Sequence, residues 1–375
     1  MKISEIRHYL HQYPELSGFE ANTAKFIVKT LREFQPNQLI ENVGGYGVLA
    51  IYKGNLPGKN ILLRADIDAL QIKEKSNLPY RSQKAGIAHL CGHDGHSAIL
   101  VEVARKLHLL KGNFTGKVIL LFQPAEETGQ GAKRVLTDPE FMKLKIDSVF
   151  GLHNLPGYKL GKIILRRQTF TSASQGVIIN LQGTASHAGH PENGNNPVFA
   201  MLQVVKELNK ISADFEKLEQ RGLITIIHLR LGEIAFGTSP GDGVVMATFR
   251  TNRAEEMQQM VKLAENMIKR IAVNHALKYE INWVEKFAAI VNNDNCVDQI
   301  IAAADNLGYE IELAEKSFSW SEDFSIFTKA FPGGFFGIGA GENHPQLHNA
   351  NYDFPDNLIE IGSEMFLEIL KLTGQ

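Results

Sequence analysis

The chain has 375 residues, of which 44% are hydrophobic and 21% are charged, and its formal net charge is −2. This length permits two domains, and the composition is that of an ordinary soluble globular protein. A nearly neutral chain without a Lys/Arg-rich run is not expected to bind nucleic acid. Because no apolar run approaches the roughly 18 residues that cross a bilayer, we also expect no membrane partner.

The cysteine content and the N-terminus indicate the compartment. The two cysteines, Cys91 and Cys296, are too few for a disulfide framework and fit a reducing environment. The first residues, MKISEIRHYLHQYPE, are polar and charged where a signal peptide has an apolar core. These features predict a cytoplasmic protein, in which we interpret Cys296 as a small core residue.

Helices and strands alternate in the first 155 residues. A helix is expected over residues 3–12, and Ser17 followed by Glu20 resembles a capping box that opens a second helix. Apolar runs predict strands at residues 48–52, 60–63, 117–122 and 148–152. Asp94 is expected to cap the helix that follows it. Such alternation predicts an α/β fold, with a mixed, mostly parallel sheet between helices and a ligand site at the carboxyl ends of its strands.

The order of predicted helices and strands changes in the middle of the chain. Residues 172–285 follow the order β-α-β-β-α-β, which is the ferredoxin-like α+β unit. We therefore predict an inserted lid and dimerisation domain over 172–285, and a catalytic domain built from 1–171 and 286–375. Gly337, Gly339 and Gly341 lack the strand–loop–helix frame of a nucleotide loop, and we expect them to make turns or to let the backbone pass close to a site.

Residues 91–96, Cys-Gly-His-Asp-Gly-His, gather four side chains that bind or orient metals. Thiolate and imidazole ligands suit zinc, manganese or cobalt better than calcium or magnesium. The metal-binding groups that we expect at strand ends are Cys91, His93, Glu127, His153 and His348, with Asp66 and Asp68 nearby. This is more than one zinc needs, and two metals with a bridging ligand would use them.

A hydrolytic two-metal site also needs one carboxylate that is not a ligand, because protons must move from water to the leaving nitrogen. Glu126 and Glu127 both follow a predicted strand, and either could have this role. Their spacing alone does not say which of the two is the ligand.

Taken together, several segments resemble the di-metal aminoacylase/carboxypeptidase family in its amidohydrolase branch, which includes hippurate hydrolases, auxin-conjugate hydrolases and N-acetyl-diaminopimelate deacetylases. The resemblance covers nearly the whole chain. The matching segments are Leu10-His11 with Pro14-Glu15-Leu16, RADIDAL (64–70), HLCGHDGH (89–96), QPAEE (123–127), GLHN (151–154), His187-Ala188 with Pro191, SEDF (321–324) and LHN (347–349).

The resemblance implies a metal centre and a catalytic pair. The residues that would bind two divalent ions, Mn²⁺ or Zn²⁺ and alternatively Co²⁺ or Ni²⁺, are Cys91 as the bridge, His93, Glu127, His153 and His348. Glu126 would be the general base and then the acid. His187 would reach into the partner subunit and stabilise the oxyanion, which implies a homodimer through the inserted domain.

Other charged residues are expected to support this centre. Asp66, Asp68 and Asp94 would orient the ligands, and Arg64 is interpreted as ion-paired scaffold. For Arg250 we weigh a scaffold role equally against binding of the substrate's carboxylate.

One segment departs from the family's pattern. Gly237-Thr238-Ser239-Pro240 stands where relatives have Asn-Val-Ile-Pro, so the asparagine that would help hold substrate is missing. This departure concerns the substrate pocket rather than the metal chemistry.

The implied activity is hydrolysis of the amide of an N-acyl amino acid, such as an N-acetyl or N-benzoyl amino acid, to a carboxylic acid and an amino acid. Two alternatives remain, namely a dipeptidase or aminopeptidase with the same centre, and a catalytically silent metal-binding relative. The presence of Glu126 argues against the silent relative. The acyl group, the amino acid and the native metal do not follow from the sequence.

Overall fold

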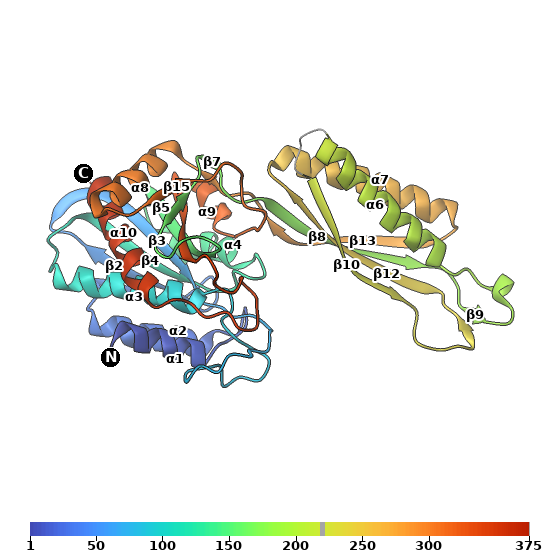
Figure 1. The fold of residues 1–375 in the computed structure, drawn as a ribbon, viewed down its shortest axis with the longest axis horizontal. Coiled ribbons are helices and arrows are strands. Elements are labelled where there is room, and N and C mark those ends of the chain that lie inside the picture. The colour runs from blue at the N-terminus through green and yellow to red at the C-terminus, as the bar shows by residue number, and fades with distance from the viewer. Residues whose placement is uncertain (218–221, 375) are drawn as a thin grey trace. The chain divides into compact units, whose positions relative to one another are not determined.

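A computed structural model describes residues 1–217 and 222–374. The chain divides into two compact units, which are described separately (Figure 1). The first comprises Met1–Phe170, Ile290–Ser317 and Glu322–Gln375, and the second comprises Thr171–Ala289 and Phe318–Ser321. None of the described helices is long and apolar enough to cross a membrane.

A mixed eight-stranded sheet forms the centre of the first unit. Its strands, in spatial order, are β1 (Gln38–Val43), β2 (Gly47–Lys53), β4 (Thr115–Gln123), β3 (Leu56–Asp66), β5 (Ser148–Pro156), β16 (Gly333–Gly341), β6 (Ile163–Leu165) and β15 (Ile311–Leu313). The pairs β4/β3, β3/β5, β5/β16 and β6/β15 are parallel, and the remaining pairs are antiparallel. The predicted mixed, mostly parallel sheet is confirmed.

Of the two interpretations of the glycine-rich segment near the C-terminus, turns are wrong for Gly337 and Gly339, whereas close approach of the backbone agrees with the structure. The segment forms β16, a buried strand next to β5. A Cβ atom on Gly337 would lie 2.1 Å from the side chain of Leu155, and one on Gly339 would lie 2.0 Å from the carbonyl oxygen of Lys159. The glycines therefore allow neighbouring segments to approach closely inside a sheet, which a turn-based interpretation of glycine does not anticipate.

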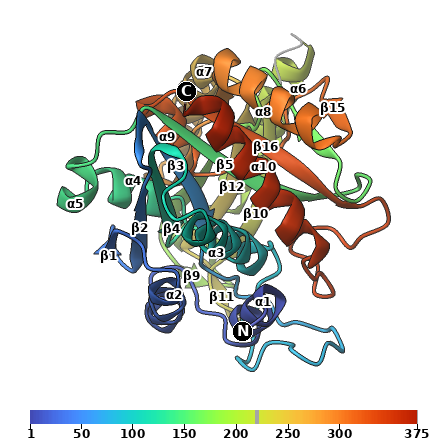
Figure 2. The same ribbon diagram turned by 90° about the vertical axis from the view of Figure 1, so that its left-hand side faces the viewer.

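Long helices cover one face of this sheet, and Figure 2 shows α3 and α10 lying across it. The helices on this face are α2 (Ala21–Glu33), α3 (His93–Leu109), α8 (Asp294–Leu307) and α10 (Asn357–Thr373), and α1 (Ile3–Gln12) packs against α3. The short helices α4 (Gly131–Leu136), α5 (Pro139–Met142) and α9 (Ser325–Ala330) lie elsewhere in this unit, as does the small sheet of β7 (Gln168–Thr169) and β14 (Val291–Asn292). The apolar faces of the long helices and the strands form one continuous core.

Both predicted helix caps are wrong. α2 begins after Glu20, whose side chain caps nothing, and the Ser17 hydroxyl donates instead to Asp68 Oδ2 at 2.6 Å. α3 begins after Gly92, so Asp94 lies inside its first turn rather than at its cap. In both cases the polar side chain that the local sequence pattern would use as a cap is engaged by a partner far away in the sequence.

The second unit has the predicted ferredoxin-like topology. Its main elements are β8 (Ala173–Gln182), α6 (Val198–Lys217), β10 (Gly222–Leu231), β12 (Asp242–Thr251), α7 (Ala254–Asn274) and β13 (Lys278–Phe287). The sheet order is β10-β12-β8-β13, with every neighbouring pair antiparallel. Figure 1 shows α6 and α7 on one face of this sheet, where they bury a separate core. A short pair, β9 (Ser186–His187) and β11 (Thr238–Ser239), and the 3₁₀ turn η1 (Pro191–Asn193) complete the unit.

Gly95 in the first turn of α3 provides a test of this packing. Replacing a helical glycine by alanine ordinarily stabilises a helix by about 1 kcal/mol. Here the added Cβ would lie 2.3 Å from the ring of Phe354, and overpacking of this kind costs about 1–3 kcal/mol. We therefore expect Gly95→Ala to lower the free energy of unfolding, measured by urea denaturation of metal-free protein.

The same contact supplies the control for this variant. In a Phe354→Leu background the overlap is smaller, so Gly95→Ala should cost less there than in the unmodified chain. An equal cost in both backgrounds would show that the ring is not the cause.

Candidate metal centre

The turn before α3 is built so that two metal-binding side chains converge. Gly92 has φ +98°, a left-handed conformation, and a Cβ on it would lie 2.4 Å from the Asn154 side chain. Glycine at this position therefore combines the tight turn with close approach to β5. Cys91 and His93 flank it and are both buried.

The predicted ligand residues come together in the first unit. Cys91 Sγ lies 3.5 Å from His153 Nε2, and these two residues form a potential metal-binding cluster with His93. Cys91, Glu127 and His348 form a second cluster, so Cys91 belongs to both. Glu127 Oε1 is 3.7 Å from His93 Nε2 and 4.0 Å from His348 Nε2.

Hydrogen bonds to neighbouring polar groups orient the potential ligands. His93 Nδ1 lies 3.0 Å from the backbone oxygen of Asp68, which leaves Nε2 facing the cluster. Asp68 Oδ2 accepts the backbone N–H of Glu127 at 3.0 Å. His153 Nδ1 lies 2.8 Å from the backbone oxygen of Asn154, which leaves Nε2 toward Cys91. A backbone or carboxylate partner on the far nitrogen of an imidazole is the usual support of a metal-binding histidine.

His96, the last residue of the motif, has a different position. Its Nδ1 lies 2.7 Å from Asp66 Oδ1 and its Nε2 lies 2.5 Å from Asn154 Oδ1. Both ring nitrogens are thus engaged, and His96 links Asp66 to Asn154, although it also groups with Asp66 and His93 as a potential metal-binding set.

The two consecutive glutamates have different surroundings. Glu127 belongs to the cluster with Cys91 and His348, whereas Glu126 also lies beside Glu322 and Asp323 and accepts the backbone N–H of Asp323 at 3.3 Å. Burial, and then the charge of Glu322, raises the pKa of Glu126 well above its usual range. Burial also raises the pKa of Glu127 to about 8. A bound cation would favour the ionised form of both groups.

Arg64 is the scaffold of this acidic region. It is buried, and its guanidinium donates to Asp66 Oδ2 at 2.6 Å, to Glu322 Oε1 at 2.8 Å and to Asp323 Oδ1 at 2.8 Å. No role was predicted for Glu322 and Asp323 from the sequence, although their segment, SEDF, matches the family's pattern. Two acids directly before Phe324, which is fully buried, were the available signal that these carboxylates enter the core.

The residues present fit a divalent cation. Within the described chain, His93 Nε2 and Glu127 Oε1 are buried atoms without a hydrogen-bond partner, and they face each other. Burying polar atoms without partners is costly, and a cation between them would satisfy both. A donor set of thiolate, imidazole and carboxylate is one that zinc and manganese accept.

His187 lies in the second unit, on β9, and its side chain is exposed. Its Nδ1 accepts the backbone N–H of Gly189 at 3.0 Å, so in the neutral ring the proton is on Nε2. β9 pairs with β11, with Thr238 opposite His187, and the N–H of Ala188 donates to the carbonyl oxygen of Gly237. The segment that departs from the family's pattern therefore lies directly beside His187.

Arg250 is also in the second unit and is half-buried. Its Nη1 donates to the backbone oxygen of Ser319 at 2.9 Å and to Ser321 Oγ at 3.2 Å. Burial lowers the pKa of its guanidinium, and no carboxylate of the described residues forms an ion pair with it. Part of its donor capacity holds the 318–321 segment, and its charge has no carboxylate partner within residues 1–217 and 222–374.

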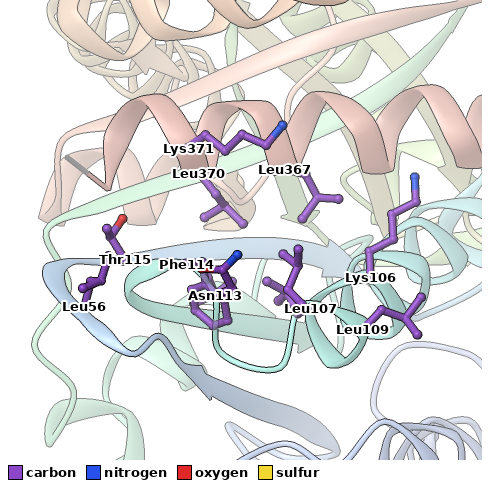
Figure 3. A pocket seen from close by; sticks show the side chains of 12 residues that line it. Leu56, Lys106, Leu107, Leu109, Asn113, Phe114, Thr115, Leu367, Leu370 and Lys371 are labelled. Atoms are coloured by element: carbon purple, nitrogen blue, oxygen red, sulfur yellow. The ribbon is translucent and has the colours of Figure 1, made fainter.

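An apolar cavity of about 780 Å³ lies far from the cluster (Figure 3). It is lined by the C-terminal end of α3, including Leu107 and Leu110, by Phe114, and by Leu367 and Leu370 of α10. His93 begins α3, so roughly 20–25 Å of helix separates the cluster from the cavity. No His, Cys, Asp or Glu is among the lining residues, and the cavity therefore offers no hydrolytic chemistry.

Comparison with known proteins agrees with this geometry. The model of peptidase family M20/M25/M40 matches residues 62–372. The chain belongs to this family. It is 31% identical to hippurate hydrolase of Campylobacter jejuni over 98% of this chain and 95% of that protein. It is 33% identical to an N-acetyl-L-cysteine deacetylase of Bacillus subtilis over 92% of this chain and 82% of that protein.

Comparison with solved structures gives the same result. A dinuclear metal-binding M20 peptidase of Bacillus subtilis superposes with a TM-score of 0.82, at 27% identity, covering 99% of this chain and 97% of that one. A putative aminohydrolase of Staphylococcus aureus gives a TM-score of 0.88 at 26% identity, covering 100% and 96%. The chain is thus a hydrolase of the M20 family, similar to members of its amidohydrolase branch. The family membership expected from the sequence motifs is confirmed.

Proposed function

We propose that this M20 hydrolase cleaves the amide bond of N-acyl amino acids, releasing a carboxylic acid and the free amino acid. The observation that supports this most is the difference in surroundings between two adjacent glutamates. Both glutamates share a potential metal-binding group with His93, but Glu127 also groups with Cys91 and His348, whereas Glu126 groups with Glu322 and Asp323 and accepts the N–H of Asp323. An unligated carboxylate at a metal centre is what amide hydrolysis requires, and a metal-storage protein has no use for it.

The residues that would hold two divalent ions, Mn²⁺ or Zn²⁺, are Cys91 as the shared ligand, His93, Glu127, His153 and His348. Such ions, when bound, lower the pKa of water and polarise an acyl carbonyl. Asp68 supports the set, since it contacts His93 and accepts the N–H of Glu127.

Glu126 moves the protons in this proposal. Its Oε1 accepts the N–H of Asp323, while Oε2 lies 4.0 Å from His93 Nε2 and so faces the cluster. Oε2 accepts a proton from the attacking water and then delivers it to the nitrogen of the leaving amino acid. Burial of Glu126 excludes bulk water that would otherwise exchange this proton.

Two residues of the second unit complete the proposal. His187 donates its Nε2 proton to the developing oxyanion of the partner subunit's substrate, a role that its Gly189-bound tautomer suits. Arg250 binds the carboxylate of the amino acid, which its unpaired charge supports. The second unit, over about residues 172–285, thereby acts as lid and dimerisation domain.

The test is amide hydrolysis by metal-stripped protein refilled with manganese, zinc or cobalt. The panel contains N-acetyl amino acids, N-benzoyl amino acids and dipeptides, and product amino acid is quantified. We expect metal-dependent release of amino acid from the acyl substrates. Faster turnover of dipeptides would replace the proposal with a peptidase, and silence of the metal-loaded protein across the panel would reject it.

The proposed homodimer has a candidate surface in the second unit. β10 is an edge strand, and α6 packs beside it. Phe199 and Leu202 on α6 and Leu223, Ile227 and Leu229 on β10 are exposed apolar side chains. An open strand edge bordered by apolar side chains is a surface that a second copy can cover by a two-fold contact.

We expect light scattering to give twice the mass of one chain, and Phe199→Asp to shift the protein to the monomer. Phe199 is 72% exposed, so a charge there disturbs an interface rather than the core. The matched control is Val273→Asp on α7, where the side chain is 63% exposed and dimerisation should persist. A monomeric unmodified protein at assay concentration would remove the role of His187 across subunits.

A further inference from the structure

The N-terminal helix carries a buried arginine that the proposed chemistry does not use. Arg7 on α1 is fully buried, and its guanidinium reaches three separate segments of the first unit. Nε donates to Asp356 Oδ1 at 2.9 Å, and Nη1 donates to Asp353 Oδ1 at 2.6 Å and to Asp94 Oδ2 at 3.3 Å. Nη2 donates to the hydroxyl of Tyr80 at 2.9 Å.

Three of these partners lie close in sequence to two of the potential metal ligands, His93 and His348. Asp94 directly follows His93 in the first turn of α3. Asp353 and Asp356 lie in the segment between β16 and α10, which also carries His348. Arg7 therefore bridges the turn that bears one imidazole ligand and the loop that bears another.

The loop of His348 depends on such tertiary contacts for its geometry. Residues 342–356, which carry His348, form none of the described helices or strands. The His348 side chain is about half exposed. His348 has φ +64°, a left-handed conformation that costs a non-glycine residue about 1 kcal/mol or more. The N–H of His348 donates to the backbone oxygen of Leu90 at 2.8 Å, which is one contact between the loop and the Cys91 turn.

Other side chains bind the same three aspartates that Arg7 binds. The Tyr80 hydroxyl donates to Asp353 Oδ2 at 2.8 Å, so both oxygens of this carboxylate are held. His8 Nε2 lies 2.8 Å from Asp356 Oδ2, and His11 Nδ1 lies 2.8 Å from Asp94 Oδ2. Each aspartate bound by Arg7 thus has a second partner. Two of these partners, His8 and His11, belong to α1, and the third, Tyr80, stacks on His8.

We propose that Arg7 is a positioning residue that holds the His348 loop against the Cys91–His93 turn and thereby sets the metal affinity of the centre. The inference rests on the proposed function, because it takes the cluster to be a metal site. Only a guanidinium has donors in a fork that reaches all of these acceptors, so lysine keeps the charge but loses the bridge. Loss of a group that hydrogen-bonds a metal ligand directly typically costs 10–100-fold in affinity, and Arg7 acts at least one contact further out, so a loss of up to about 10-fold is expected.

Two variants and one control test the proposal. Arg7→Lys removes the fork, and Tyr80→Phe removes only the hydroxyl that holds Asp353. Arg167→Lys is the control, since Arg167 is an exposed arginine that also pairs with two carboxylates, Asp294 and Asp298. The measurements are Mn²⁺ titration by calorimetry, and hydrogen exchange of residues 342–356 in metal-free protein by mass spectrometry.

We expect Arg7→Lys to bind Mn²⁺ more weakly, by up to about 10-fold, and the backbone amide hydrogens of residues 342–356 to exchange faster, whereas Arg167→Lys should match the unmodified chain. Tyr80→Phe should shift both readouts in the same direction by less, and it decides the question if Arg7→Lys fails to fold. A lower melting temperature with unchanged Mn²⁺ affinity and unchanged exchange would reduce Arg7 to a structural residue and overturn the proposal.

The outcomes also separate this inference from the proposed function. If the unmodified chain binds no Mn²⁺, Zn²⁺ or Co²⁺, the proposed function and the metal-affinity part of this inference both fail. If the unmodified chain binds metal and Arg7→Lys binds it equally well, the proposed function stands and only the role of Arg7 is rejected.

Discussion

Glu126→Gln is expected to lower kcat for the best acyl amino acid substrate by about 10²–10⁴-fold, the usual contribution of a general acid–base group. Glutamine has nearly the same shape, so the contact of residue 126 with the Asp323 N–H can persist. The amide cannot accept and return a proton, and the loss should therefore fall on kcat rather than on substrate binding. Steady-state kinetics with the manganese-loaded protein measure it.

The adjacent glutamate provides the matched control. Glu127→Gln changes the same atoms one residue further along, but Glu127 lies within the Cys91 and His348 cluster. We expect this variant to lose metal in a calorimetric titration, whereas Glu126→Gln should bind metal like the unmodified chain. If Glu126→Gln lost metal and kept activity once saturated, the two roles would have to be exchanged.

Arg64→Met is expected to have the largest effect on stability among the predictions, about 3–5 kcal/mol in the free energy of unfolding. Arg64 is buried and pairs with Asp66, Glu322 and Asp323, which are buried as well. Methionine fills much of the volume but leaves these carboxylates in the core without their shared counter-charge. Urea denaturation of the metal-free protein at pH 8 measures the loss.

An exposed arginine serves as the control for Arg64. Arg32 pairs with Glu41 at 3.0 Å, and both side chains are exposed, Arg32 to 68% and Glu41 to 44%. Surface pairs of this kind contribute about 0–1 kcal/mol, so Arg32→Met should be nearly neutral. A loss below 1 kcal/mol in Arg64→Met would contradict the scaffold role, because the acids would then be stable in the core without the arginine.

Local patterns in the sequence were sufficient where neighbouring residues decide the structure. Apolar runs predicted β4 and β5, and the β-α-β-β-α-β rhythm predicted the ferredoxin-like second unit. Periodicity works here because side-chain direction repeats every two residues in a strand and about every 3.6 in a helix. The same patterns failed for the caps, where Ser17 binds Asp68 instead. They also did not predict that the glycines lie in a strand, where Gly337 packs against Leu155 of β5 and Gly339 against Lys159 of the loop after β5.

The candidate ligands could be identified from residue type and order in the sequence, because thiolate, imidazole and carboxylate donors are few and the motif segments are specific. The different surroundings of Glu126 and Glu127 could not be predicted, since the two residues are equivalent in sequence and only packing brings Glu322 and Asp323 against Glu126. The bridge made by Arg7 was equally inaccessible. Its partners Asp94, Asp353 and Asp356 lie 87 to 349 residues away along the chain, so folding alone decides that one buried guanidinium meets them all.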